Sequence, residues 1–403
     1  MSDAPRDPVH GSYHAFYGVV RTFCGVPLVS SRADVAAADA VVIGAPFDEG
    51  VSYRPGTRFG PQAVRTAEDI NLTGDRPSMH AGIDPLKELN IVDWGDIDVV
   101  ASDLPRSHAL LTEAAGAALA TDTVPVVIGG DHSLSHAMLA AMHGQFGADG
   151  YSVIHFDTHA DTGIPEDGEP PHGTPFRAAI ERGHLKGTNI FQIGLRGTWP
   201  GPELFQWMRE QGMQWATMDE VIDRGITDVV REAIAFARQA APKTYLTVDI
   251  DVLDPAYAPG TGTPEPGGLT TRELLRAVRT VTNELDVAAF DLVEVSPPYD
   301  HAAITAMAGH RTLLEGLNGM ALRRAGRPAQ HERPGLHRSS PMPTCTTMPW
   351  SARCSTSQRS QMTSCSRPRR PVPRSPLRCR LPKRLRVLCS NPRDPSPLPL
   401  DEA

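Results

Sequence analysis

Short apolar segments alternate with amphipathic helical patterns between residues 40 and 322, and this alternation restricts the folds that the chain can adopt. Several of these segments are nearly continuous in Val, Ile and other apolar residues, as expected of strands buried on both faces of a parallel sheet. The predicted strands are Ala40–Ala45, Leu89–Asp93, Val124–Gly129, Ser152–Asp157, Asn189–Ile193, Thr244–Asp249 and Val287–Val293. The predicted helices are Ser107–Leu119, Ser133–Met142, Pro175–Arg182, Pro202–Glu210, Asp228–Gln239, Thr271–Thr282 and Ala302–Leu322. We therefore predict one α/β fold with helices on both faces of a mostly parallel sheet.

The chain changes character after residue 322. Residues 323–403 contain 17 Lys and Arg against four Asp and Glu, whereas residues 1–322 contain 22 against 43. The later segment is rich in Pro, Arg and Ser, and such a composition cannot bury enough apolar surface to offset the entropy lost on ordering. We predict one folded domain over residues 1–322 and a disordered basic tail over residues 323–403. Both a natural extension and out-of-frame translation of a GC-rich message would give this tail composition.

The composition favours a cytoplasmic protein without a membrane or nucleic-acid partner. The first residues are polar and acidic and do not resemble a signal peptide, and no run approaches the about 20 apolar residues of a membrane helix. The acidic body should attract cations and repel nucleic acid, and the tail lacks a recognisable nucleic-acid-binding module. The six cysteines include no CxxC pair, which argues against a zinc motif, and a cytoplasmic location argues against disulfides.

Three segments rich in Asp and His lie at the ends of predicted strands. They read GGDHS at 129–133, HFDTHAD at 155–161 and DIDVLDP at 249–255. Side chains two residues apart in extended backbone point to the same side, so Asp157, His159 and Asp161 can converge, as can Asp249 with Asp251. The carboxyl ends of parallel strands gather at one edge of the sheet, where the three segments can meet. Each segment alone would also fit a polar loop, an acidic turn or a strand–helix junction.

The converging Asp and His side chains of these segments, with His132 of the first segment, supply two imidazoles and four carboxylates. This set is too large for one tetrahedral zinc and contains no thiol. Oxygen-rich ligands with some imidazole suit manganese, or iron or cobalt, in near-octahedral sites. Four carboxylates also balance two divalent cations, so the sequence predicts a dinuclear metal site that favours a cationic substrate.

These segments closely resemble the signatures of the ureohydrolase (arginase/agmatinase) family, as do residues 52–65 (SYRPGTRFGPQAVR) and 294–300 (EVSPPYD). The resemblance extends from about Ala40 to about Leu322. It implies a three-layer α/β/α fold with a mostly parallel, roughly eight-stranded sheet. It also implies a homo-oligomer, either a trimer or a hexamer.

The resemblance assigns roles to single residues. It implies two Mn²⁺ ions per subunit, bridged by Asp157 and Asp249. His132 and Asp161 would complete one metal site, and His159 and Asp251 would complete the other. The remaining carboxylates of these segments, on Asp131 and Asp254, would support the ligands or the local structure.

Two further residues are candidates for catalysis. A metal pair lowers the pKa of bound water, which provides a nucleophile for the guanidinium carbon. His172, in the sequence HGTP, matches the family histidine and is the candidate proton shuttle to the leaving amine. Glu294 matches the glutamate that holds the substrate guanidinium. The alternatives are a loop histidine that begins a helix and a surface glutamate.

The choice of substrate depends on the loop at 162–171, TGIPEDGEPP. Its acidic residues Glu166, Asp167 and Glu169 suit the distal ammonium of agmatine, although charged loop residues often only face water. Gly163 stands where arginases carry an Asn, which argues against arginase. The predicted reaction is hydrolysis of agmatine to putrescine and urea, a step of polyamine biosynthesis. The alternatives are guanidinobutyrase or another guanidino-acid amidinohydrolase, including proclavaminate amidinohydrolase.

Two other classes of protein fit less well. Deacetylases share the expected fold but use a single zinc with a different ligand set, so the intact DxHxD and DxDxxDP segments disfavour them. A metal-binding regulatory relative without activity is the non-enzyme alternative, but such proteins usually lose ligands, and all six are present here.

Overall fold

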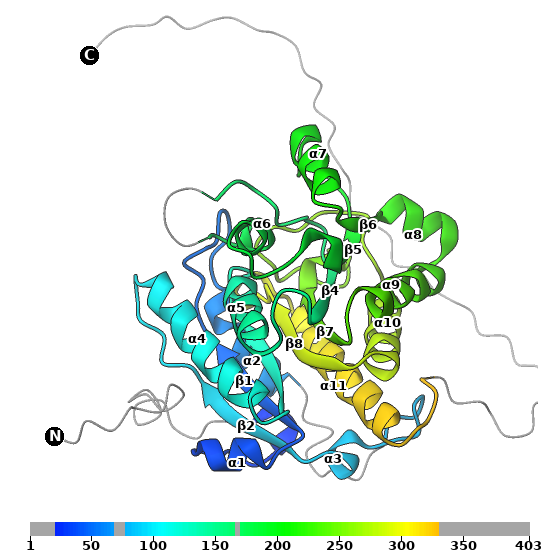
Figure 1. The fold of residues 1–403 in the computed structure, drawn as a ribbon. Helices are drawn as coiled ribbons and strands as arrows, with labels where there is room; N and C mark the ends of the chain where they lie inside the picture. Colours follow the sequence, from blue (N-terminus) through cyan, green and yellow to red (C-terminus); the bar gives the residue numbers. More distant parts are fainter. Residues whose placement is uncertain (1–20, 68–76, 166–169, 330–403) are drawn as a thin grey trace, which may run out of the picture. The chain divides into compact units, whose positions relative to one another are not determined.

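Eight parallel strands form the centre of the structure, a computed structural model that describes residues 21–67, 77–165 and 170–329 (Figure 1). The strands run in the order β2-β1-β3-β8-β7-β4-β5-β6, and every neighbouring pair is parallel. Their bounds are β1 Ala40–Ala45, β2 Ile91–Asp96, β3 Val124–Gly129, β4 Tyr151–Phe156, β5 Ile190–Leu195, β6 Gln214–Thr217, β7 Lys243–Asp249 and β8 Val287–Val293. The predicted parallel, roughly eight-stranded sheet is therefore confirmed.

The strand bounds follow the apolar pattern closely. β1, β3 and β8 begin and end at the predicted residues, because each is a buried apolar run bounded by polar or turn residues. β6 was not predicted. It is a four-residue strand at the sheet edge with only Ala216 fully buried, so it has no continuous apolar run to mark it.

Helices cover both faces of the sheet (Figure 1). Their bounds are α1 Arg32–Ala36, α2 Gly60–Thr66, α3 Pro85–Glu88, α4 Leu104–Leu119, α5 Leu134–Phe146, α6 Pro175–Glu181, α7 Pro202–Glu210, α8 Met218–Arg224, α9 Ile226–Ala240, α10 Thr271–Glu284 and α11 Ile304–Arg324. The short helices α1, α2, α3 and α8 were not predicted, because few turns give little periodicity. The longer helices match their patterns, and α10 begins with a capping box between Thr270 and Glu273.

Two hydrophobic cores fill the spaces between the three layers, one on each face of the sheet. Val41 and Ile43 of β1 pack in one core with residues of α4, α5 and α6, whereas Val42 packs in the other with residues of α9, α10 and α11. This alternation follows from the period of two in a strand. The three-layer α/β/α arrangement is therefore confirmed.

The predicted boundary at residue 322 falls inside α11, which ends at Arg324. The described chain continues to Ala329, whose carbonyl accepts a hydrogen bond of 3.2 Å from Arg279 Nε. The rest of the predicted tail, residues 330–403, lies outside the described residues. Among the helices of the described ranges, none is both long and apolar enough to cross a membrane.

Candidate metal centre

Four adjacent strands end at the candidate site. β3, β8, β7 and β4 are neighbours in the sheet. His132 comes shortly after β3, Glu294 directly after β8 and Asp157 directly after β4, and Asp249 is the last residue of β7. All strands are parallel, so these segments meet at one carboxyl edge, although they are far apart in the sequence.

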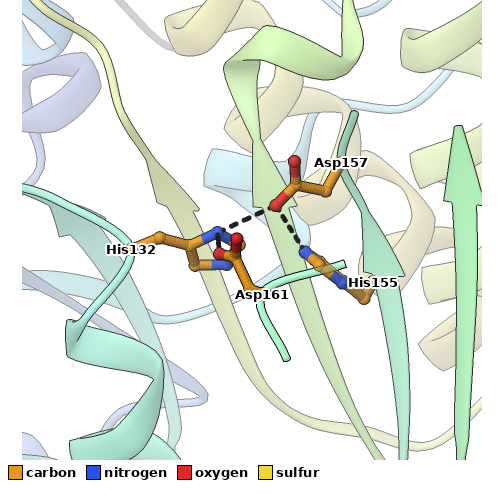
Figure 2. Close-up of side chains that lie close together, drawn as sticks. All are labelled: His132, His155, Asp157 and Asp161. Carbon is orange, nitrogen blue, oxygen red and sulfur yellow. Dashed lines mark hydrogen bonds and ion pairs between the residues drawn. The ribbon is translucent and has the colours of Figure 1, made fainter. Parts of the chain in front are cut away.

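The imidazole of His132 faces three carboxylates. Its Nδ1 lies 3.0 Å from Asp157 Oδ2, 2.9 Å from Asp161 Oδ2 and 3.3 Å from Asp249 Oδ2. Figure 2 shows this nitrogen between Asp157 and Asp161. The other ring nitrogen, Nε2, lies 3.1 Å from the Thr247 hydroxyl, which holds the ring with Nδ1 directed into the cluster.

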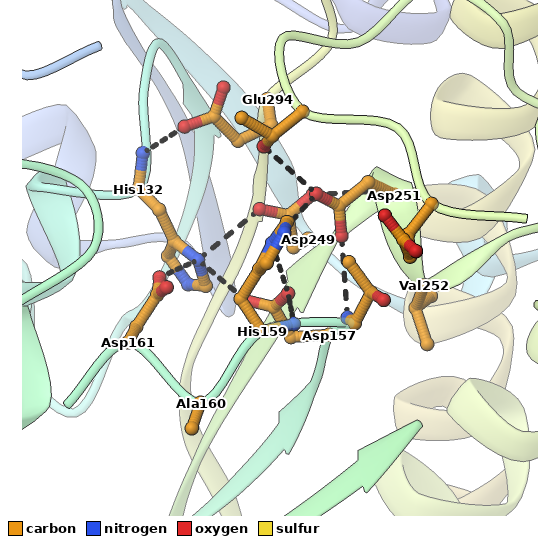
Figure 3. Close-up of polar contacts among 12 residues, drawn as sticks. His132, Asp157, His159, Ala160, Asp161, Asp249, Asp251, Val252 and Glu294 are labelled. Carbon is orange, nitrogen blue, oxygen red and sulfur yellow. Dashed lines mark hydrogen bonds and ion pairs between the residues drawn. The ribbon is translucent and has the colours of Figure 1, made fainter. Parts of the chain in front are cut away.

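A second group of side chains surrounds His159 (Figure 3). Its Nδ1 lies 3.2 Å from Asp251 Oδ2 and 3.4 Å from Asp157 Oδ1. Asp157 therefore turns Oδ2 to His132 and Oδ1 to His159, as a carboxylate bridging two ions would. Asp249 contacts His132 and accepts a hydrogen bond of 2.8 Å from the Asp251 N–H. The bridging role of Asp249 remains a prediction.

The cluster concentrates negative charge away from water. Burial and then the neighbouring carboxylates of Asp251 and Asp157 raise the pKa of Asp249 well above its usual range. Burial and then Asp157 raise the pKa of Asp251 to about 6. Burial opposes protonation of His159, but Asp251 and Asp157 raise its pKa to about 12. Cations bound among these groups would relieve the repulsion between the carboxylates.

The backbone adopts costly conformations at two site residues. Asp161 has φ of +51° and Glu294 has φ of +63°, in a region that non-glycine residues rarely occupy. Such strain gathers at functional sites, where the surrounding structure holds it in place. A close approach also requires glycine at position 194, where φ is +113° and a Cβ would lie 2.8 Å from the Asp157 carbonyl oxygen.

Two sets of candidate ligand atoms are compact enough to hold an ion, among the residues that the structure describes. One consists of Asp157, His159 and Asp251, and the other of His132, His155, Asp157 and Asp161. His155 was not among the predicted site residues. Its signal in the sequence is its position two residues before Asp157, in extended backbone that places both side chains on one side.

Glu294 and His172 lie side by side next to this cluster. Glu294 Oε1 accepts a hydrogen bond of 2.9 Å from the His132 backbone N–H and lies 2.9 Å from His172 Nδ1. On the opposite side of the ring, the Ser52 N–H donates to His172 Nε2 at 3.0 Å, and the Ser52 hydroxyl lies 2.7 Å away. Burial lowers the pKa of His172, but the Glu294 carboxylate outweighs this and raises it to about 9.

Asp131 and Asp254 hold loops in place. Asp131 accepts hydrogen bonds from the N–H groups of Gly50 at 2.8 Å and Ser133 at 2.9 Å. Asp254 accepts from Ala256 at 2.9 Å and from the Gly267 N–H at 2.7 Å. Both side chains therefore organise the backbone of nearby loops, and the supporting role assigned to them stays a prediction.

The arrangement of donors fits bound divalent ions. In the part of the chain that the structure describes, His132 Nδ1 is buried without a hydrogen bond, although carboxylate oxygens surround it. A nitrogen lone pair among oxygens of several carboxylates is a ligand set that suits manganese. The acidic loop residues Glu166, Asp167 and Glu169 lie outside the described residues.

An all-parallel three-layer fold with carboxylates and imidazoles converging at its carboxyl edge defines a candidate metal-dependent hydrolase. The sequence profile of the Arginase family matches residues 38–318. The chain is 41% identical to proclavaminate amidinohydrolase of Streptomyces clavuligerus over 279 residues, covering 67% of this chain and 84% of that protein. The chain therefore belongs to the arginase family, and it is an amidinohydrolase that acts on guanidino compounds.

Other relatives differ in the substrate that their names state. Guanidinobutyrase of Pseudomonas aeruginosa is 36% identical, with 77% of this chain and 96% of that protein covered. Agmatinase of Bacillus subtilis is 35% identical, with 74% and 97% covered. The solved structure of the Streptomyces clavuligerus enzyme has a TM-score of 0.67 at 36% identity, covering 76% of this chain and 99% of that chain. These similarities support the arginase-like fold and leave the guanidino compound open.

Proposed function

We propose that this chain binds two Mn²⁺ ions and hydrolyses agmatine to putrescine and urea. The observation that carries the reaction type is the free oxygen of Glu294. Oε1 of this carboxylate is engaged by His132 and His172, whereas Oε2 is buried without a hydrogen-bond partner among the described residues. A buried carboxylate oxygen without a partner is costly. A guanidinium N–H placed against Oε2 would satisfy it and would be held beside the metal cluster.

The six predicted ligands would together hold two ions. His132 and Asp161 would hold one ion, His159 and Asp251 would hold the other, and Asp157 and Asp249 would be shared by both. Manganese ions bound there would lower the pKa of bound water towards neutrality and so supply the nucleophile. The chain itself positions the guanidinium through Glu294 and keeps the carboxylates apart from bulk water by burial.

His172 is placed to supply the proton that the leaving amine requires. Its pKa of about 9 favours the positively charged ring, with both nitrogens protonated, at neutral pH. The Ser52 hydroxyl, 2.7 Å from Nε2, can accept from the protonated ring and can donate to the neutral ring. The Ser52 backbone N–H suits only the neutral ring. Ser52 therefore accommodates His172 after it has given up its proton.

Replacing His172 by Asn is expected to lower kcat by about 10²- to 10⁴-fold, the usual worth of a general acid or base. Bound manganese should stay at the parent level, because the His172 ring contacts Glu294 and Ser52, neither of which is a predicted ligand. Steady-state urea release and metal analysis would measure both. His143→Asn, on α5, is the matched control, and an equal loss of kcat in both variants would argue against the shuttle.

The acidic segment at 166–169 is the reason for preferring agmatine, because its carboxylates suit a distal ammonium. Arg54, which lies within the described residues, favours a second candidate substrate. Arg54, half-buried two residues after Ser52, lies against Tyr53 at 5.1 Å and Tyr299 at 5.3 Å, measured to the ring centroids. Within the described ranges it forms no ion pair with a carboxylate of this chain. A free guanidinium at this position would suit the carboxylate of a guanidino acid, such as 4-guanidinobutyrate.

The deciding experiment is urea release by the manganese-loaded chain from agmatine, 4-guanidinobutyrate, 3-guanidinopropionate and arginine. The highest kcat/KM with agmatine would support the proposal, and production of putrescine should match urea. A preference for 4-guanidinobutyrate that Arg54→Met removes would replace agmatine by a guanidino acid. No urea from any of the four, with two ions bound, would count against the reaction itself.

We also place this activity in the cytoplasm and in a homo-oligomer, a trimer or a hexamer. The support is the membership of the arginase family. Light scattering of the purified chain would measure the assembly, and a monomeric mass at full activity would contradict it.

A further inference from the structure

His155 is the one residue of the two compact ligand sets to which the predicted metal centre assigns no role. It lies on β4, is fully buried, and its Nε2 is 2.8 Å from Asp157 Oδ2 (Figure 2). Two roles fit this position. Nε2 could present a lone pair to a metal ion, or it could carry a proton and donate it to Asp157.

Gln192 distinguishes the two roles. It lies directly opposite His155 in the pairing of β4 with β5. Its Nε2 is 2.7 Å from the carbonyl oxygen of Ala160 and 2.9 Å from His155 Nδ1. A carbonyl oxygen only accepts, so the group 2.7 Å away must be the amide nitrogen. The reversed amide would place two oxygens against each other.

The orientation of Gln192 determines which nitrogen of His155 carries the proton. One N–H of the Gln192 amide donates to Ala160, and the other donates to His155 Nδ1. Nδ1 therefore accepts, and the proton of the neutral ring is on Nε2, directed at Asp157. A protonated Nε2 has no lone pair for a metal ion.

We infer that His155 is a positioning residue that donates a hydrogen bond to Asp157 and is not itself a metal ligand. This inference rests on the proposed metal centre. The hydrogen bond holds Asp157 where its two oxygens face His132 and His159. The Gln192 amide makes two hydrogen bonds. One selects the tautomer of His155, and the other holds the carbonyl group of Ala160 in place.

Packing restricts the alternatives open to these side chains. The Phe176 ring lies 4.5 Å from the His155 ring and 5.7 Å from the His132 ring, between centroids, and Phe176 is fully buried. A rotated His155 would lose both Gln192 and Asp157, and unpaired polar atoms are costly in this buried setting. Ala160 lies between the predicted ligands His159 and Asp161, so its contact with Gln192 also orders the ligand loop.

A matched pair of substitutions tests this role. His155→Gln keeps an N–H near the position of Nε2, whereas His155→Met has a similar length and lacks the donor. Manganese binding to the full chain is measured by calorimetry, and the spin coupling of the two ions by low-temperature electron paramagnetic resonance. His155→Met should weaken manganese binding by about 10- to 100-fold and alter the spin coupling. His155→Gln should stay within a few-fold of the parent.

Gln192→Met provides an independent measurement. It leaves the His155 side chain in place but lets either of its ring nitrogens carry the proton. Like His155→Met, it should weaken manganese binding. If His155 is instead a ligand, both His155 variants will bind one ion fewer and Gln192→Met will bind two normally. That result, or parent-like affinity and spin coupling in all three variants, would overturn the inference.

The parent chain and the metal-free variants provide the controls. Thermal unfolding of the metal-free proteins shows whether a variant has lost its fold, and an unfolded His155→Met leaves Gln192→Met as the test. Failure of the parent to bind two ions would overturn the metal centre and this inference together. A parent that binds two ions but releases no urea would count against the proposed reaction alone, since the comparison of affinities still applies.

Discussion

Asn in place of Asp157 is expected to remove manganese from both groups of ligands and to lower urea release by about a thousandfold or more, since water then loses its activation. Asp157 is fully buried and turns one oxygen to His132 and the other to His159. Asn keeps the size of the side chain but loses its charge and one acceptor oxygen. Metal analysis after gel filtration, together with a urea assay, would measure both losses.

Asp254→Asn is the matched control for this substitution. Asp254 comes three residues after Asp251, but its side chain accepts hydrogen bonds from loop N–H groups and is only partly buried. It should keep two ions and most of the activity. Retention of both ions and of parent activity by Asp157→Asn would rule out the assigned bridging role.

Replacing Glu294 by Gln should reduce kcat/KM by about a hundredfold or more, the usual cost of removing one partner of a buried charged pair. Gln can still accept from the His132 N–H, so the local backbone should persist. The variant loses the negative charge that would attract the substrate guanidinium. Manganese content should not change, because Glu294 is not a predicted ligand.

Glu181→Gln removes a carboxylate of the same type from the surface of α6. The Glu181 side chain is exposed at its pair with Arg177, so the change should alter neither the activity nor the stability appreciably. Kinetics with the preferred substrate, with metal content measured in the same samples, would compare the two variants. Equal kcat/KM in Glu294→Gln and the parent would exclude a role in holding the guanidinium.

The sequence was most informative for structural features whose physical cause is a local pattern of residues. β1, β3 and β8 were delimited correctly, because a strand buried on both faces is mostly apolar and is bounded by polar or turn residues. The convergence of Asp157, His159 and Asp161 was also predictable from their spacing. The structure brings these side chains together with His132, as the resemblance to the family implied.

Other features of the site had weaker signals. Gln192 is a polar residue inside the apolar run Ile190–Leu195, which marks a position with a special partner but does not name it. His155 repeats the spacing of the ligands on the same strand, and so spacing alone cannot distinguish a ligand from a hydrogen-bond donor. Ser52 has no sequence signal for its contact with His172, because 120 residues separate the two.

The sequence by itself determined the α/β class, most of the strands and the chemistry of the ligand segments, because hydrophobic period and side-chain type are local properties. Only the tertiary structure decided the order of the strands, since strand pairing depends on contacts between distant segments. Placing β8 between β3 and β7 brings Glu294 beside His132. Pairing β4 with β5 places Gln192 against His155 and so decides which nitrogen of that ring holds the proton.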